Sequence, residues 1–183
     1  MREPAPKRPA RKEIRVPPPL DAAALERLAL RYVERFATTR ARLAAYLVRK
    51  IRERGWEGAN AAPEDLAEKL AELGYIDDRA FGEARAAAMG RRGLGKRRVT
   101  GALHQDGIDE ADSAAIVPAV EERAVETALA FARRKRIGPF ALVAAERPLR
   151  EKHIAAMIRA GHDFTLARRI ASMAPGDIFD TLS

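Results

Sequence analysis

The chain has 183 residues, of which 47% are hydrophobic but only 5% aromatic, and it contains no cysteine. The lack of cysteine excludes disulfides, thiolate catalysis and cysteine metal sites, and it is consistent with a reducing cytosol. The formal net charge of +8, from 34 Lys and Arg against 26 Asp and Glu, indicates a polyanionic partner. No apolar run approaches the roughly 18 residues of a membrane span, so we expect a cytoplasmic protein without a membrane partner.

Residues 1–19 differ in composition from the rest of the chain. They hold six of the eleven prolines and, with six basic against two acidic residues, half of the net charge. Such a composition cannot bury a core and favours extended or disordered chain. We therefore expect a disordered basic tail here, and a second, short tail at residues 176–183.

Helical periodicity begins after the N-terminal tail. Apolar residues recur at steps of three and four over 20–36 and again over 39–54, which predicts two helices that each bury one face. Pro63 suits the first turn of a third helix, which Gly74 would end. We therefore expect residues 20–74 to form a unit of three helices.

The rest of the chain predicts two further three-helix units, 75–117 and 118–175. The second opens with Asp77 or Asp78, which we interpret as helix caps rather than as a paired-carboxylate site. Pro118 marks the start of the third unit. No segment alternates with period two for long enough to predict a strand, so the fold class is all-α. The predicted helices lie at about 78–90, 96–106, 110–117, 118–136, 149–160 and 163–173.

These units are related by an internal repeat with a spacing of roughly 54 residues, because 96–109 matches 150–163. In both copies a Gly suits the left-handed residue that ends one helix, and an Asp suits the N-cap of the next. A weaker copy, 43–50, lies about 56 residues upstream of 99–106. Such a period predicts a repeat architecture. The aligned pairs are Ala102 and Ala156, Leu103 and Met157, Gly107 and Gly161, Asp109 and Asp163, and Ile116 and Ile170.

Three basic clusters are the candidate binding residues. Two of them end predicted helices, where a positive side chain offsets the helix dipole by about 0.3 to 1 kcal/mol. That explanation needs only one or two charges per cluster, so the surplus favours a ligand role. The middle cluster lies around a glycine-rich loop, which either meets an anion or is simply solvated. The first cluster is Arg49, Lys50, Arg52 and Arg54; the second is Arg91, Arg92, Lys96, Arg97 and Arg98; the third is Arg133, Arg134, Lys135 and Arg136.

The sequence contains partial matches to catalytic motifs, but none of them lies in the structural context that the motif requires. Residues 90–97 match most of the phosphate-binding pattern G-x-x-x-x-G-K-[ST], but the last position is Arg97 and a helix precedes the loop where a strand is required. His104, His153 and His162 lie apart, without carboxylate partners in a recognisable motif, which argues against a metal or general-base role. The sequence predicts no catalytic residue, no metal and no cofactor.

Five segments of the chain match the motifs of one known family. The most specific is LAELGYIDD at 70–78. The segments are ALRYVERF at 29–36, LAELGYIDD at 70–78 with Phe81, the glycine loop before 99–108, AFARRKRIGPF at 130–140, and AGHDF at 160–164 with ARR at 167–169. Together they resemble the RecX family, regulators of the bacterial recombinase RecA. His162 stands where that family's Gly–aromatic turn carries an aromatic residue.

This resemblance implies an elongated, curved array of three tandem three-helix repeats. It also implies a cytoplasmic, monomeric protein without enzymatic activity that lies in the groove of the RecA filament on single-stranded DNA. There it would lower recombinase, ATPase and coprotease activity in DNA repair and the SOS response, with weak, sequence-independent DNA binding. The three basic clusters are the residues expected to contact the filament.

Two other functions fit the residues. A helix-turn-helix regulator would use residues 96–105 as its recognition helix, and it would dimerise and discriminate between DNA sequences. A helical-repeat scaffold would use its basic tail only for solubility, and it would not bind DNA at low salt.

Overall fold

The structure is a computed structural model that describes residues 18–179, so most of the expected N-terminal tail and the last four residues lie outside it. Within that range the chain forms nine α-helices, one short 3-10 helix and no strand, which confirms the all-α class. The helices are α1 (Ala22–Val33), α2 (Arg40–Arg54), α3 (Pro63–Glu72), α4 (Asp78–Arg91), α5 (Lys96–Gln105), α6 (Glu110–Glu122), α7 (Ala124–Lys135), η1 (Gly138–Phe140), α8 (Arg147–Arg159) and α9 (Phe164–Ser172).

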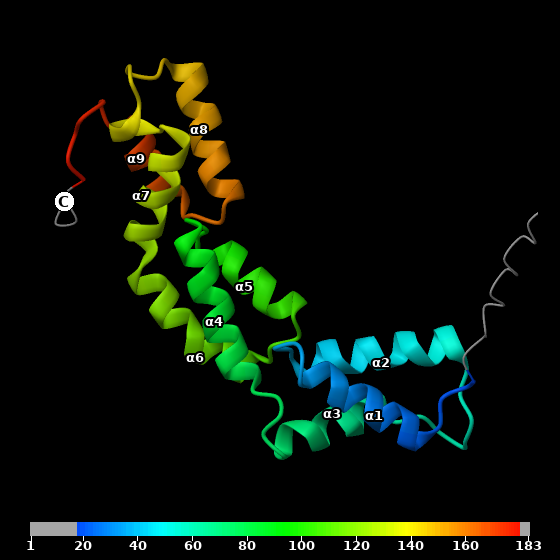
Figure 1. Ribbon diagram of the computed structural model, residues 1–183. Helices are drawn as coiled ribbons and strands as arrows, with labels where there is room; N and C mark the ends of the chain where they lie inside the picture. The colour runs from blue at the N-terminus through cyan, green and yellow to red at the C-terminus, as the bar shows by residue number, and fades with distance from the viewer. Residues whose placement is uncertain (1–17, 180–183) are drawn as a thin grey trace, which may run out of the picture.

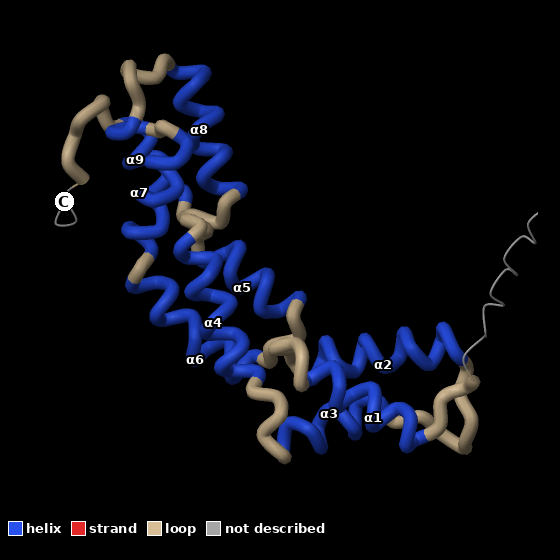
Figure 2. The backbone as a smooth tube through the Cα atoms, in the orientation of Figure 1, coloured by secondary structure: helices blue, strands red, loops and turns tan. Residues whose placement is uncertain are grey.

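The helices form three consecutive sets of three, which we call the first set (α1–α3), the second set (α4–α6) and the third set (α7–α9). Helices of one set pack mainly on one another. The sets follow one another in an elongated, curved array, with the first set as one arm and the other two as the second arm (Figure 1). The helices α2, α5 and α8 lie along the inner side of the bend (Figure 2). This arrangement confirms the predicted curved array.

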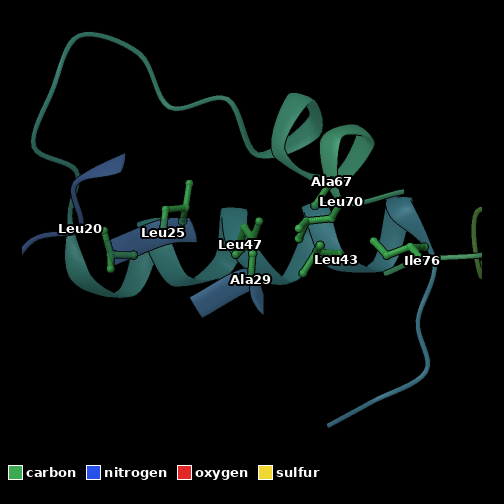
Figure 3. Close-up of a cluster of buried hydrophobic side chains, with 9 residues drawn as sticks. Leu20, Leu25, Ala29, Leu43, Leu47, Ala67, Leu70 and Ile76 are labelled. Atoms are coloured by element: carbon green, nitrogen blue, oxygen red, sulfur yellow. The ribbon is translucent and has the colours of Figure 1, made fainter. Parts of the chain in front are cut away.

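Each set has its own small hydrophobic core. In the first set, side chains from α1, α2 and α3 meet in a cluster that includes Leu43, Leu47 and Leu70 (Figure 3). The second and third sets bury separate clusters around Leu103 and Met157. Leu47, Leu103 and Met157 are all fully buried, and the repeat register aligns all three. The core is therefore divided into three parts, as expected for an array of thin helical layers.

The turns that precede α6 and α9 confirm the left-handed glycine and the aspartate N-cap that the repeat predicted. Gly107 and Gly161 have positive φ values of 77° and 97°, a conformation that glycine adopts without steric cost. Asp109 and Asp163 are the N-caps, and each accepts a hydrogen bond from a backbone N–H of the following turn. The same turn thus starts the third helix of the second and third sets.

One predicted boundary is wrong. The sequence suggested a break at Pro118, but α6 continues through it to Glu122, and α7 starts only at Ala124. A proline inside a helix removes one backbone hydrogen bond. Pro118 is exposed, and so is Ala114, whose carbonyl loses its partner; water can therefore satisfy that carbonyl.

Candidate functional site

The first basic cluster lies at the end of α2. Arg49 and Lys50 both pair with Glu53 of the same helix, with an Arg49 Nε–Oε1 distance of 3.6 Å. Both also lie over the ring of Tyr46, at 5.5 and 5.8 Å from its centroid. The hydrogen bond from Lys50 lowers the pKa of Glu53. These two cations are therefore partly neutralised by their own helix.

The other two members of the first cluster differ from each other. Arg54 donates two hydrogen bonds, of 3.1 and 2.7 Å, to the carbonyl oxygen of Pro18, so it holds the chain that enters α1. Arg52 is exposed. The whole cluster stands at the end of the array that is far from α7 (Figure 1).

The glycine-rich loop between α4 and α5 forms the joint between the second and third sets. A Cβ placed on Gly93 would stand 2.7 Å from the backbone nitrogen of Phe131. One placed on Gly95 would stand 2.5 Å from the carbonyl carbon of Gly161. These glycines are required because two backbones pass each other here at close range.

Backbone N–H groups at the start of α5 already have partners within the protein. Gly95 donates to the carbonyl of Ala160 at 2.9 Å, and Arg97 donates to the carbonyl of Gly161 at 3.2 Å. The N–H groups of Gly95 and Arg97 are therefore not free to bind a phosphate, as the pattern matched by residues 90–97 would require. Lys96 forms an ion pair with Glu121 of α6. The exposed members of the second cluster are Arg91, Arg92, Lys96, Arg97 and Arg98.

The third basic cluster, at the end of α7, meets the second at this joint. Arg134 donates a hydrogen bond to the carbonyl oxygen of Arg92 and lies over the ring of Phe131 at 5.5 Å. Arg133 lies over Phe140 at 4.9 Å. Arg136 has a left-handed backbone (φ 54°) that ends the helix. All four members, Arg133, Arg134, Lys135 and Arg136, are exposed.

His162 is buried at the same joint. Its Nε2 atom lies 3.0 Å from the carbonyl oxygen of Gly93, and its ring meets Phe131 edge-on at 5.6 Å. Because a carbonyl oxygen can only accept, Nε2 carries the proton. Burial lowers the pKa of His162, against the weaker, opposite effect of the bond to Gly93. His162 thus acts as a neutral structural link between the second and third sets.

Basic residues recur at the start of the inner helices. In the repeat register, Lys96 of α5 aligns with Arg150 of α8, and Arg98 aligns with Lys152. Arg98 and Lys152 are exposed and Arg150 is partly exposed. Our sequence reasoning missed Arg150 and Lys152, although the repeat register alone could have identified them. The joint through Gly95 and Gly161 places the start of α5 beside the end of α8, so Arg150 and Lys152 lie further along the array, toward the start of α8 (Figure 1). We call the basic residues of these two helices on the inner side of the bend the inner basic face: Lys96, Arg97, Arg98, Arg150 and Lys152.

The equivalent position in the first set has a different role. Arg40, 56 residues before Lys96, points its Nε atom at Asp78 Oδ2, at 2.9 Å. The hydrogen bond to Asp78 is the main cause that raises the pKa of Arg40. The N-cap of α4 is Asp77, as expected, but Asp78 is a buried partner of Arg40 rather than a cap.

Residues 18–179 contain no group of three or more His, Asp or Glu side chains placed to hold a metal ion. In the same range, no helix has both the length and the apolar character needed to cross a membrane.

The chain is similar to known proteins in both sequence and fold. No family model matches the chain. The chain is 31% identical over 160 residues to the regulatory protein RecX of Myxococcus xanthus, which covers 82% of this chain and 86% of that protein. It is 26% identical over 141 residues to the regulatory protein RecX of Agrobacterium fabrum, covering 75% and 76%.

Solved structures share the fold. A crystal structure of RecX from Lactobacillus salivarius superimposes with a TM-score of 0.58 at 18% identity, over 81% of this chain and 92% of that one. A second crystal structure of a regulatory protein RecX gives a TM-score of 0.56 at 24% identity, over 81% and 72%. Since the Myxococcus protein matches along most of both chains and the curved helical array is common to the solved structures, this chain belongs to the RecX family of regulatory proteins.

Proposed function

We propose that this protein binds along the RecA filament on single-stranded DNA and lowers the recombinase, ATPase and coprotease activities of RecA in DNA repair and the SOS response. It acts as a cytoplasmic monomer, without catalysis of its own. Besides the family, the observation that supports this proposal is the inner basic face. The three clusters predicted from the sequence remain part of the proposed interface. The second cluster shares Lys96, Arg97 and Arg98 with this face, the third lies beside the second, and the first lies at the distant end.

The position of these charges within their helices favours a ligand role. A positive side chain near a helix N-terminus is opposed by the dipole by about 0.3 to 1 kcal/mol. Lys96, Arg97 and Arg98 nevertheless fill the first turn of α5, which holds no acidic residue. Helix stability therefore does not explain them, whereas it does explain part of the clusters that end α2 and α7.

The geometry of α5 weighs against the helix-turn-helix alternative. A recognition helix inserts its N-terminal residues into the major groove. Here the backbone at Gly95 and Arg97 is bonded to the turn at Ala160 and Gly161, so the third set lies directly against the backbone at the start of α5. Contacts from side chains around such a joint suit phosphates, which carry no sequence information.

The test is the double variant Arg98→Ala with Lys152→Ala. The slope of log affinity against log salt is negative, and it becomes shallower by about 0.7 for every phosphate of single-stranded DNA that the protein no longer neutralises. Loss of two contacts should therefore make the slope shallower by about 1.4. Inhibition of strand exchange and of DNA-dependent ATP hydrolysis by the cognate RecA should weaken in parallel. Fluorescence anisotropy with an oligonucleotide, across a salt series, measures the slope.

A matched control is Arg27→Ala with Arg79→Ala, which removes the same charge from exposed positions on α1 and α4. We expect this control to keep both inhibition and salt slope. Stability should change by less than about 1 kcal/mol in both double variants, as is usual for exposed substitutions. If the Arg98 and Lys152 variant inhibits RecA as well as the parent does, the inner basic face is not the interface.

A further inference from the structure

The contact between the first and second sets centres on one arginine. From the start of α2, the guanidinium of Arg40 reaches Asp78 at 2.9 Å, Glu68 at 3.1 Å and Asp109 at 3.5 Å. The backbone N–H of Arg40 also donates to Asp78 Oδ1 at 2.9 Å. Asp78 therefore binds both the backbone and the side chain of the same residue, which holds the start of α2 against the start of α4.

Burial makes the loss of either partner of the Arg40–Asp78 pair costly. Only 5% of the Asp78 side chain is exposed, against 33% for Arg40. A buried carboxylate that loses its cation partner is strongly destabilising, because the remaining charge is left uncompensated. The arrangement seen here is therefore favoured over any rotation of the first set that would separate the two groups.

Other contacts accompany the ion pair. Arg42 forms an ion pair with Asp106 at 3.9 Å and lies over the ring of Phe81 at 5.5 Å. The hydroxyl of Thr39 donates to the backbone carbonyl of Asp106. Next along the chain, Ala41 packs so closely on Gly107 that a Cβ on that glycine would overlap it. All of these contacts lie at the first turn of α2, so the joint is small and its position is set by a few side chains.

The joint between the second and third sets is built differently. There, α4 and α6 both pack against α7, and the loop backbones are bonded directly to each other. Among the described residues, no helix of the first set packs extensively on a helix of the second. The joint between the second and third sets is thus formed by helix packing and backbone hydrogen bonds. The joint between the first and second sets is smaller and is formed largely by ion pairs between side chains.

We propose that Arg40 and Asp78 are the positioning pair that sets the angle of the first set relative to the rest of the array. With the pair intact, α2 is locked against α4; without it, the first set turns about the connection at residues 73–77. The repeat register supports this special role, because Arg40 occupies the position of Lys96 and Arg150 on the inner basic face. This inference goes beyond the proposed function and does not require it.

The experiment measures distances within the full chain by double electron–electron resonance. Because the chain has no cysteine, spin labels can be placed at chosen sites. Ala45→Cys with Gly101→Cys spans the first joint, and Gly101→Cys with Ala155→Cys spans the second. Asp78→Asn keeps an acceptor for the Arg40 N–H but removes the charge. We expect this variant to lose the single narrow distance peak across the first joint and to keep it across the second.

Arg79→Gln is the control, since Arg79 follows Asp78 but is exposed and pairs with Glu83 of its own helix at 3.1 Å. It should leave both peaks narrow. A second variant, Arg40→Lys, keeps the charge but loses the guanidinium that binds Asp78 and Glu68 together, and it should broaden the first peak only. If Asp78→Asn loses its helical circular dichroism, Arg40→Lys decides the question. An unchanged peak across the first joint in the folded variants overturns the proposal.

Discussion

At the scale of single residues, His162 couples the stability of the protein to pH. Burial lowers the pKa of this side chain below its ordinary value of 6.5, so the folded protein keeps it neutral. The unfolded chain takes up a proton as the pH falls through about 6.5, while the folded protein takes one up only at a lower pH. The stabilisation contributed by neutral His162 is therefore complete above that pH and declines below it.

We predict that the free energy of unfolding decreases between pH 7 and pH 5, with a contribution from His162 of at most about 1.4 kcal/mol per pH unit. His162→Gln keeps an N–H donor for Gly93 but does not titrate, so its pH dependence should be flatter. Urea unfolding at several pH values measures this difference. A parental slope in His162→Gln would contradict the prediction.

The two aspartates at the start of α4 show what the sequence can and cannot predict for single residues. Asp77 accepts a hydrogen bond from Ala80, three residues away, so its capping role follows from local pattern. Asp78 depends on Arg40, which is 38 residues distant. No local rule identifies that partner, whereas Arg150 and Lys152 could have been found by extending the internal repeat.

At the scale of elements, the loop between α4 and α5 shows the same limit. Its composition did not indicate which group approaches the glycines, and the structure shows that the backbone of the third set does so at Gly93 and Gly95. The sequence could not show this, because the partner turn at Ala160 and Gly161 lies some 65 residues further along. The helix boundary at Pro118 was missed for a related reason, since the penalty for proline depends on whether water reaches the freed carbonyl.

Gly95→Ala tests the tightness of this loop. Gly95 has φ of −85°, which any residue adopts, so the effect of the substitution is steric alone. Overpacking of this kind costs about 1 to 3 kcal/mol. Gly101→Ala is the matched control, because nothing lies within 4 Å of its new methyl group. In mid-helix it should add about 0.5 to 1 kcal/mol of stability. Chemical unfolding followed by circular dichroism compares the two, and equal stabilities would refute the close approach.

At the scale of the whole molecule, the repeat predicted the number of helices and their grouping, because each set repeats one local pattern. The curvature could not be derived from that pattern. It depends on the angle at each joint, and the two joints use different residues: glycine backbone in one and a buried ion pair in the other. The approximate 54-residue period therefore predicts the units but not how they are joined.

Charge distribution leads to a prediction for the complete chain. Residues 1–17 carry half of the formal net charge, so their deletion should weaken DNA binding and flatten its salt dependence. The melting temperature should stay nearly unchanged, because a proline-rich charged segment contributes few buried contacts. The deletion must stop before Pro18, whose carbonyl binds Arg54. Thermal melting and a salt titration test both parts, and a large drop in melting temperature would show that the segment is docked.

Arg40 is the first residue of α2, so a small rotation at this end displaces the other end of the helix by several ångströms. With 15 residues, α2 spans about 22 Å. A turn of about 10° at its start would carry its far end through about 4 Å. The first basic cluster stands at that far end, and 4 Å is already longer than a charged hydrogen bond. Loss of the Arg40–Asp78 pair is therefore expected to displace the first basic cluster, Arg49, Lys50, Arg52 and Arg54.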